Sequence, residues 1–168
     1  NSAFNEITGN TDDYWPTDLR EQIADINERV YETVNNGVYK AGFATSQDAY
    51  DDAVYPLFDS LTWLESILEN NRFLAGDKLT EADWRLFTTL ARFDLVYHTH
   101  FKCNHKRLTD YPNLWAYTRQ LYQHADIAET VHFDHIVRHY HFSQTTVNPY
   151  QIIPINPTVD FSAPHERD

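Results

Sequence analysis

The chain of 168 residues has one cysteine, four glycines and no methionine. A single cysteine cannot form an internal disulfide, so the composition suits a reducing compartment and predicts a cytoplasmic protein. No apolar run approaches the ~20 residues that a membrane-spanning helix needs, and the first residues do not resemble a signal peptide. Few glycines and few stretches of alternating polar and apolar residues predict an all-α fold.

Basic charge is also scarce, because 13 Lys and Arg residues face 25 Asp and Glu residues, for a formal net charge of −12. No basic stripe is available to displace the counterions of a phosphate backbone, which argues against nucleic-acid binding. Acidity alone identifies no partner, since acidic residues commonly cover solvated helix faces.

The stretch from Leu74 to Asn104 organises the rest of the chain. Thr80 and Asp83 have the spacing of a capping box, in which the side chain of each residue bonds the backbone of the other. Apolar residues follow at helical spacing on more than one side, which predicts a central helix in a bundle: Leu86, Phe87, Leu90, Phe93 and Val96.

Four further helices are expected around this one. The periodicity predicts a helix over 18–34 that opens with an Asp18–Glu21 capping pair, ends at Asn35-Asn36-Gly37 and is followed by a connection over 38–43. It also predicts helices over 46–68, with a kink at Pro56, 112–122 and 126–141. We therefore expect a linker remnant over 1–16, a helical domain over 17–144 and an extended tail over 145–168.

Two sets of residues suggest chemistry but have simpler interpretations. His132, His135 and His139 share one helix face and could bind zinc or nickel, although solvated histidines at this spacing are commoner. Cys103 could be a nucleophile, but a lone cysteine at the end of an apolar helix usually packs as a small hydrophobe.

Three of the eleven tyrosines stand where a bundle cavity or rim is expected. They are Tyr39, Tyr97 and Tyr140, near the ends of three predicted helices. A phenol can donate a hydrogen bond to a thiolate or to a quinone oxygen, and it can pass a proton. Residue chemistry alone leaves the alternative that these are core or rim aromatics.

Several blocks carry a family resemblance. They are Val34–Ala44 (VNNGVYKAGFA), Phe73–Asp77 (FLAGD), Leu79–Asp83 (LTEAD), Arg92–Tyr97 (RFDLVY), His100–Asn104 (HFKCN), Asp110–Leu114 (DYPNL), Asn148-Pro149 and Pro164-His165. Through them the chain resembles the C-terminal helical domain of glutathionyl-hydroquinone reductases, the xi class of glutathione transferases.

The resemblance implies a glutathione-dependent enzyme, a homodimer when complete, with a nucleophilic cysteine on an N-terminal thioredoxin-like domain. It assigns Tyr39 the role of proton donor and acceptor, and it assigns Tyr97 and Tyr140 the stabilisation of the cysteine thiolate. Glutathione is then a co-substrate bound mainly by the other domain, no metal is needed, and this half forms the quinone side of the site. On these terms we expect the isolated chain to be inactive.

Two departures from the family pattern lie near the quinone side of the site, and we expect them to change substrate preference. The chain has His141–Gln144 where relatives carry a Ser-His pair, and it has Asn156 where relatives carry glycine. Two other functions stay open at this stage. One is a non-catalytic helical interaction module, and the other is an omega-like glutathione thioltransferase.

Overall fold

A computed structural model describes residues 3–167. Within that range the regular structure is helical, apart from an isolated bridge between Phe73 and Gly76, which confirms the all-α prediction. The α-helices are α1 (Asn5–Thr8), α2 (Arg20–Val30), α3 (Gly37–Gly42), α4 (Gln47–Leu68), α5 (Glu81–Leu90), α6 (His98–His100), α7 (Pro112–Tyr122) and α8 (Phe133–Ser143). Two π-helical turns, η2 (Tyr31–Asn35) and η3 (Phe93–Tyr97), and three 3₁₀ turns, η1 (Thr17–Leu19), η4 (Leu108–Asp110) and η5 (Ala128–Thr130), complete the set.

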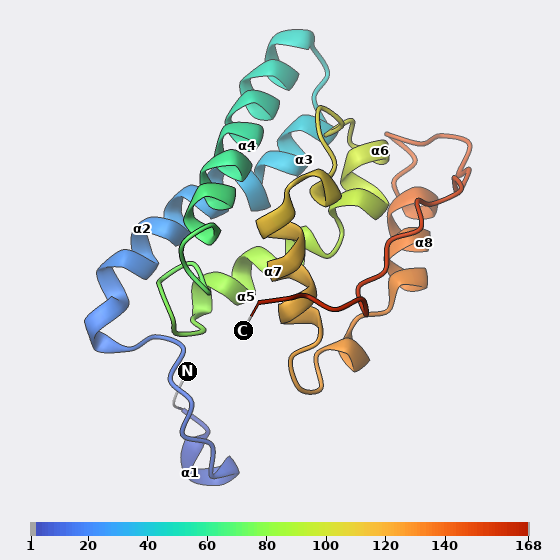
Figure 1. Ribbon diagram of the computed structural model, residues 1–168. Helices are drawn as coiled ribbons and strands as arrows, with labels where there is room; N and C mark the ends of the chain where they lie inside the picture. The colour runs from blue at the N-terminus through green and yellow to red at the C-terminus, as the bar shows by residue number, and fades with distance from the viewer. Residues whose placement is uncertain (1–2, 168) are drawn as a thin grey trace.

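Helix α5 lies in the middle of the bundle, with α2, α3 and α4 on one side and α7 and α8 on the other (Figure 1). The capping box at its start forms as the sequence predicts. Asp83 is fully buried, and its carboxylate accepts hydrogen bonds from the Thr80 amide at 2.7 Å and the Leu74 amide at 3.0 Å. The Tyr117 hydroxyl of α7 donates to the same carboxylate at 2.8 Å, so one side chain joins α5, its entry loop and α7.

The first long helix does not end at Asn35-Asn36-Gly37, and that prediction is wrong. Helix α2 runs through η2 into α3, and Gly37 keeps a helical backbone rather than the left-handed conformation of a helix stop. The expected connection over 38–43 is therefore mostly helix, which places Tyr39 on a helix face. The predicted Asp18–Glu21 capping pair is also wrong, because η1 precedes α2 and no side chain caps either element.

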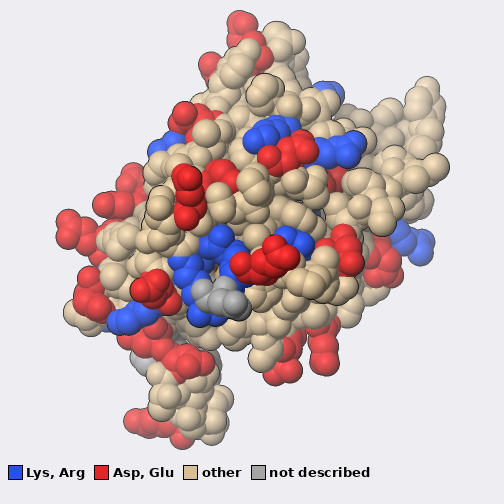
Figure 2. All heavy atoms as spheres, in the orientation of Figure 1, with Lys and Arg blue, Asp and Glu red and all other residues tan. Residues whose placement is uncertain are grey.

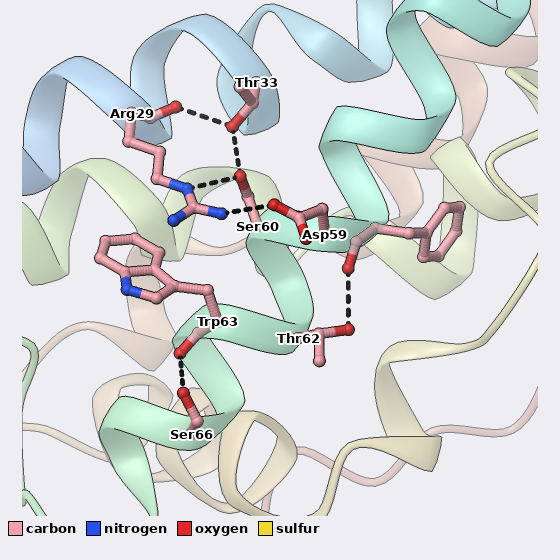
Figure 3. A network of polar contacts seen from close by, with 8 residues as sticks. Arg29, Thr33, Asp59, Ser60, Thr62, Trp63 and Ser66 are labelled. Atoms are coloured by element: carbon pink, nitrogen blue, oxygen red, sulfur yellow. Dashed lines mark hydrogen bonds and ion pairs between the residues drawn. The ribbon is translucent and has the colours of Figure 1, made fainter.

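A polar network holds α2 and η2 on α4 (Figure 3). The guanidinium of Arg29 donates to Ser60 at 2.9 Å and to Asp59 at 2.7 Å, and it lies 4.3 Å from the centre of the Trp63 ring. The Thr33 hydroxyl donates to Ser60 at 2.8 Å. These contacts fix the side of the bundle from which α3 extends.

Helices α4 and α7 start where the sequence predicts, but α8 starts later. Ser46 caps α4, which runs unbroken through Pro56. Glu65 of α4 accepts hydrogen bonds from the amides of the first turn of α7, 2.9 Å from Asn113 N. Helix α8 begins at Phe133 rather than at Asp126, because Asp126 has φ +65° and η5 intervenes.

The tail after α8 contains no helix or strand as far as residue 167 and returns across the bundle to lie near α7 (Figure 1). Phe161 is buried, and its carbonyl accepts a hydrogen bond from Gln123 at 2.8 Å. Arg167 donates to the Leu68 carbonyl at 3.3 Å and to the Asn71 carbonyl at 2.8 Å, at the C-terminal end of α4. The end of the tail therefore fastens the last turn of α4.

Acidic side chains are spread over the face drawn in Figure 2, and a smaller group of basic side chains lies near the middle of this view. None of the helices over residues 3–167 has the length and apolar character needed to cross a bilayer.

Candidate active site

The three tyrosines singled out by the sequence meet at one point. Tyr39 comes from α3, Tyr97 from η3 and Tyr140 from α8. The Tyr97 and Tyr140 hydroxyl oxygens are 3.0 Å apart, and the Tyr39 and Tyr97 oxygens are 3.5 Å apart. The Tyr39 and Tyr140 hydroxyls also form a hydrogen bond. We call these residues the tyrosine cluster.

A close contact between two sequence blocks positions this cluster. A Cβ atom added to Gly42 would lie 2.2 Å from the ring of Phe101, so only glycine lets α3 approach this ring. Phe101 is stacked on Tyr97, with ring centres 5.5 Å apart, and meets Tyr39 edge-on at 5.3 Å. Gly42 of the VNNGVYKAGFA block and Phe101 of the HFKCN block thus fix where the phenols of Tyr39 and Tyr97 lie.

Both π-helical turns border the same site. A π turn inserts an extra residue into a helix and changes which side chains face a given direction, and such turns are frequent at functional sites. Turn η3 carries Tyr97, and η2 carries Asn35, which donates to Thr89 of α5 at 2.7 Å. The two turns therefore shape the space between α3 and α5.

The cluster opens on a cleft of about 730 Å³ between α3, α5 and the end of the N-terminal segment. The sequence patterns do not predict the other residues of its wall. Arg92 could have been noticed from the sequence, because it is the only charged residue between Leu86 and Phe93. The cleft is lined by Tyr14, Tyr31, Asn35, Asn36, Tyr39, Glu81, Trp84, Arg85, Thr88, Thr89, Arg92, Tyr97 and Tyr140.

Exposure and protonation differ within the cluster. Tyr39 is 37% exposed, whereas Tyr97 and Tyr140 are 2% and 5% exposed. Burial, and then Tyr140, raise the pKa of Tyr97. Burial, and then the hydrogen bond with Tyr39, raise the pKa of Tyr140 to about 12. Both phenols are therefore neutral hydrogen-bond donors at neutral pH.

The other candidate groups do not form a site. Cys103 is fully buried, and burial raises the pKa of its thiol to about 12, which suits a packed side chain and not a nucleophile. His132 and His135 lie with ring centres 5.2 Å apart, while the His139 ring packs on Tyr140. Between residues 3 and 167, no group of three or more histidine, cysteine, aspartate or glutamate side chains is arranged to hold a metal.

Comparisons with known proteins agree with this architecture. The family model described as "Glutathione S-transferase, C-terminal domain" matches residues 47–120. The chain is 55% identical to "Glutathionyl-hydroquinone reductase YqjG" of Escherichia coli over 168 residues, which is all of this chain and 51% of that protein. It superimposes on the glutathione-bound YqjG structure with a TM-score of 0.98 at 54% identity, covering 99% of this chain and 54% of that one. With the xi-class transferase of Natrialba magadii the TM-score is 0.95 at 50% identity, covering 98% and 50% of the two chains.

Over its whole length the chain is similar to xi-class glutathione S-transferases. It corresponds to their C-terminal region and spans about half the length of the curated relatives it matches. A relative in Schizosaccharomyces pombe, 44% identical over 94% of this chain and 53% of that protein, is named "Glutathione S-transferase omega-like 2". The similarity to the xi class confirms the family resemblance drawn from the sequence blocks.

Proposed function

We propose that the protein containing this chain reduces glutathionyl-hydroquinones to hydroquinones, and that this chain forms the quinone side of the active site. The observation that carries the proposal is the convergence of three phenol hydroxyls at the mouth of a cleft of about 730 Å³. The names of the two curated reductases, in Escherichia coli and Sphingobium chlorophenolicum, supply the reaction.

The reaction consists of two thiol steps. A cysteine thiolate on a thioredoxin-like domain, separate from this helical half, attacks the sulfur of the glutathionyl group. The carbon–sulfur bond breaks, its electron pair stays on the hydroquinone carbon, and that carbon takes a proton. The cysteine is left in a mixed disulfide with glutathione. A second glutathione thiolate attacks this disulfide, releases oxidised glutathione and restores the cysteine.

The tyrosine cluster supplies what these steps need from this side of the site. Tyr39 is the most exposed of the three phenols and is the donor to the hydroquinone carbon and the acceptor in the reverse direction. Tyr97 and Tyr140 stay protonated and donate toward the thiolate, which stabilises the charged form of the cysteine.

A count of protons limits how many of the three phenols can donate out of the cluster at one time. Three phenols have three O–H protons, and the two closest contacts, Tyr39 with Tyr140 and Tyr97 with Tyr140, use two of them. The third contact, at 3.5 Å, is at the limit of a hydrogen bond. One O–H therefore remains free to donate to a ligand in the cleft.

The proposal includes the partners of this chain. The thioredoxin-like domain binds glutathione and packs on the open side of the cleft, no metal takes part, and the complete protein is a cytoplasmic homodimer. Without that domain the chain has neither nucleophile nor glutathione site, so it is inactive alone. Reductase turnover by the purified chain of 168 residues would contradict this.

The test is Tyr39→Phe in the complete protein, with the rate measured on a glutathionyl-hydroquinone. Loss of a general acid should lower kcat/KM by about 100-fold. The matched control is Tyr55→Phe, since Tyr55 is 71% exposed on α4 and lies outside the cleft. Equal rates in the two variants would show that Tyr39 is not the proton donor. Absence of turnover by the complete wild-type protein would instead favour a non-catalytic interaction module.

The name of the Schizosaccharomyces pombe relative keeps omega-like thioltransfer as a second candidate. Transfer between thiols and simple mixed disulfides needs no proton on carbon, so it should be insensitive to Tyr39→Phe. Comparing the complete protein on a glutathionyl-hydroquinone and on a simple glutathione mixed disulfide separates the two activities.

A further inference from the structure

Two buried histidines lie directly behind the tyrosine cluster, and the proposed reaction does not use them. His100 ends α6, and His141 follows Tyr140 in α8. Their ring centres are 4.7 Å apart, with the rings 73° from parallel. His100 is 6% exposed and His141 is 2% exposed, so the pair is part of the interior.

The pair connects the elements that carry the buried phenols. Nε2 of His100 is 2.9 Å from the side-chain oxygen of Gln144, on the residue that follows α8. The His100 ring also meets Tyr140 edge-on at 6.5 Å. The backbone of Leu95, in the π turn that carries Tyr97, faces the His141 ring and raises its pKa. The two rings therefore hold α8 against η3 and α6.

The surroundings of the pair suit two neutral imidazoles. The Gln144 oxygen is an acceptor, so Nε2 of His100 carries the single proton of a neutral ring. Nε2 of His141 is buried and makes no hydrogen bond, so a proton added there would have no acceptor. Protonating both rings would place two positive charges side by side at a largely buried position, which is unfavourable.

The groups that face the pair do not offset this charge. Burial, and then Lys102, lower the pKa of His100, which the Gln144 hydrogen bond opposes. Burial, and then His100, lower the pKa of His141, which the Leu95 backbone opposes. From α8, the Tyr140 ring faces His100, and the His139 ring and the charge of Arg92 act on Tyr140. No carboxylate in the described part of the chain contributes to either shift.

We propose that His100 and His141 are positioning residues for Tyr140. While both imidazoles are neutral, they hold Tyr140 in the tyrosine cluster. When the pair is protonated, Tyr140 leaves the cluster. The consequence for activity rests on the proposed reductase function, but the consequence for the cluster does not. The pair would make the geometry of the cluster sensitive to acid.

The experiment follows the tyrosine ring carbons of the chain by NMR after labelling at Cζ, from about pH 8 to about pH 5, the range around an ordinary histidine pKa. Tyr97→Phe and Tyr140→Phe assign the two signals. We expect both signals to shift together, with a midpoint below the ordinary histidine pKa of 6.5, because the pKa values of both histidines are lowered. Signals that stay constant over this range would overturn the proposal.

Two variants and one control make the result specific to the pair. Gln144→Glu places a carboxylate against Nε2 of His100 and should raise the midpoint by roughly one pH unit or more. His141→Phe keeps a ring but removes the nitrogens, so it should remove the shared transition. His135→Phe, on an exposed position of α8, should leave the transition unchanged. An unchanged midpoint in Gln144→Glu would contradict the proposal even if His141→Phe does not fold.

The same variants in the complete protein separate this inference from the proposed function. If the tyrosine signals titrate as expected and no reductase activity is found, the positioning role stands and the reductase function fails. If the reductase is active and its acid limb is the same in wild type and in Gln144→Glu, the positioning role fails.

Discussion

The buried Tyr117 and the tyrosine cluster differ in what their hydroxyls contact. Tyr117 is fully buried and donates its proton to Asp83 at 2.8 Å. Burial, and then the charge of Asp83, raise the pKa of Tyr117 well above 10.0. The Asp83 carboxylate also accepts from the Leu74 and Thr80 amides and from the Thr80 hydroxyl, so the donors and acceptors of this network are matched.

The tyrosine cluster is built from the same side chain but is open. Its hydroxyls contact one another, and Tyr39 is 37% exposed toward the cleft. Burial raises the pKa of Tyr97 as it does for Tyr117, so a shifted pKa does not distinguish the two places. What distinguishes them is a spare O–H that faces a cavity. We therefore expect substitutions at Asp83 and Tyr117 to change stability, and substitutions in the cluster to change activity.

The Asp83 carboxylate and its donors on Leu74, Thr80 and Tyr117 form what we call the closed network. The largest effect should come from Asp83→Asn, which breaks this network. Each carboxylate oxygen of Asp83 accepts two hydrogen bonds, so in either orientation the new amide group meets two donors. Leaving these donors unpaired in the interior should lower the free energy of unfolding by about 3 kcal/mol or more. Urea unfolding of the chain measures this change.

Asp77→Asn is the matched control for that substitution. Asp77 lies in the same entry loop but is exposed, so its change should stay within about 0.5 kcal/mol. A loss at Asp83 no larger than the loss at Asp77 would mean that the closed network does not hold α5 in place.

The second prediction compares the same substitution, tyrosine to phenylalanine, in the closed network and in the tyrosine cluster. Tyr117→Phe removes a buried hydrogen bond to a carboxylate and should lower the free energy of unfolding by about 2 kcal/mol. Tyr39→Phe leaves the hydrogen bond between Tyr97 and Tyr140 intact, so its effect on unfolding should be below about 1 kcal/mol. Urea unfolding of both variants tests the contrast, and equal losses would remove the distinction between the two sites.

The closed network is the easier of the two to predict from sequence. Thr80 and Asp83 are three residues apart at the start of an apolar segment, so local spacing alone indicates their contact. The start of α7 at Pro112 follows from the same kind of local signal. The start of α8 does not, because Asp126 adopts a left-handed backbone, a conformation that Asp tolerates but does not require.

The open site depends on contacts between distant segments, which local patterns do not encode. Asn35-Asn36-Gly37 has the composition of a helix stop, but η2 carries the helix onward because the segment packs on α4. Gly42 is needed for the approach of Phe101, a residue 59 positions later, and not for a turn. Family resemblance selects Tyr39, Tyr97 and Tyr140, and no spacing rule joins them.

The smallest effect concerns a single member of the closed network. Thr80→Ala removes the hydroxyl that donates to Asp83 at 2.9 Å and should lower the free energy of unfolding by about 1 kcal/mol. The effect is smaller than that of Asp83→Asn, because the carboxylate keeps three donors and the Asp83 amide keeps the Thr80 carbonyl as its acceptor at 3.2 Å. Thr80→Ser, which keeps the hydroxyl, should recover most of the loss in the same urea titration. If Thr80→Ala were as damaging as Asp83→Asn, unpaired donors would not be what destabilises the network, and loss of the Thr80 side chain would have to disrupt the start of α5 itself.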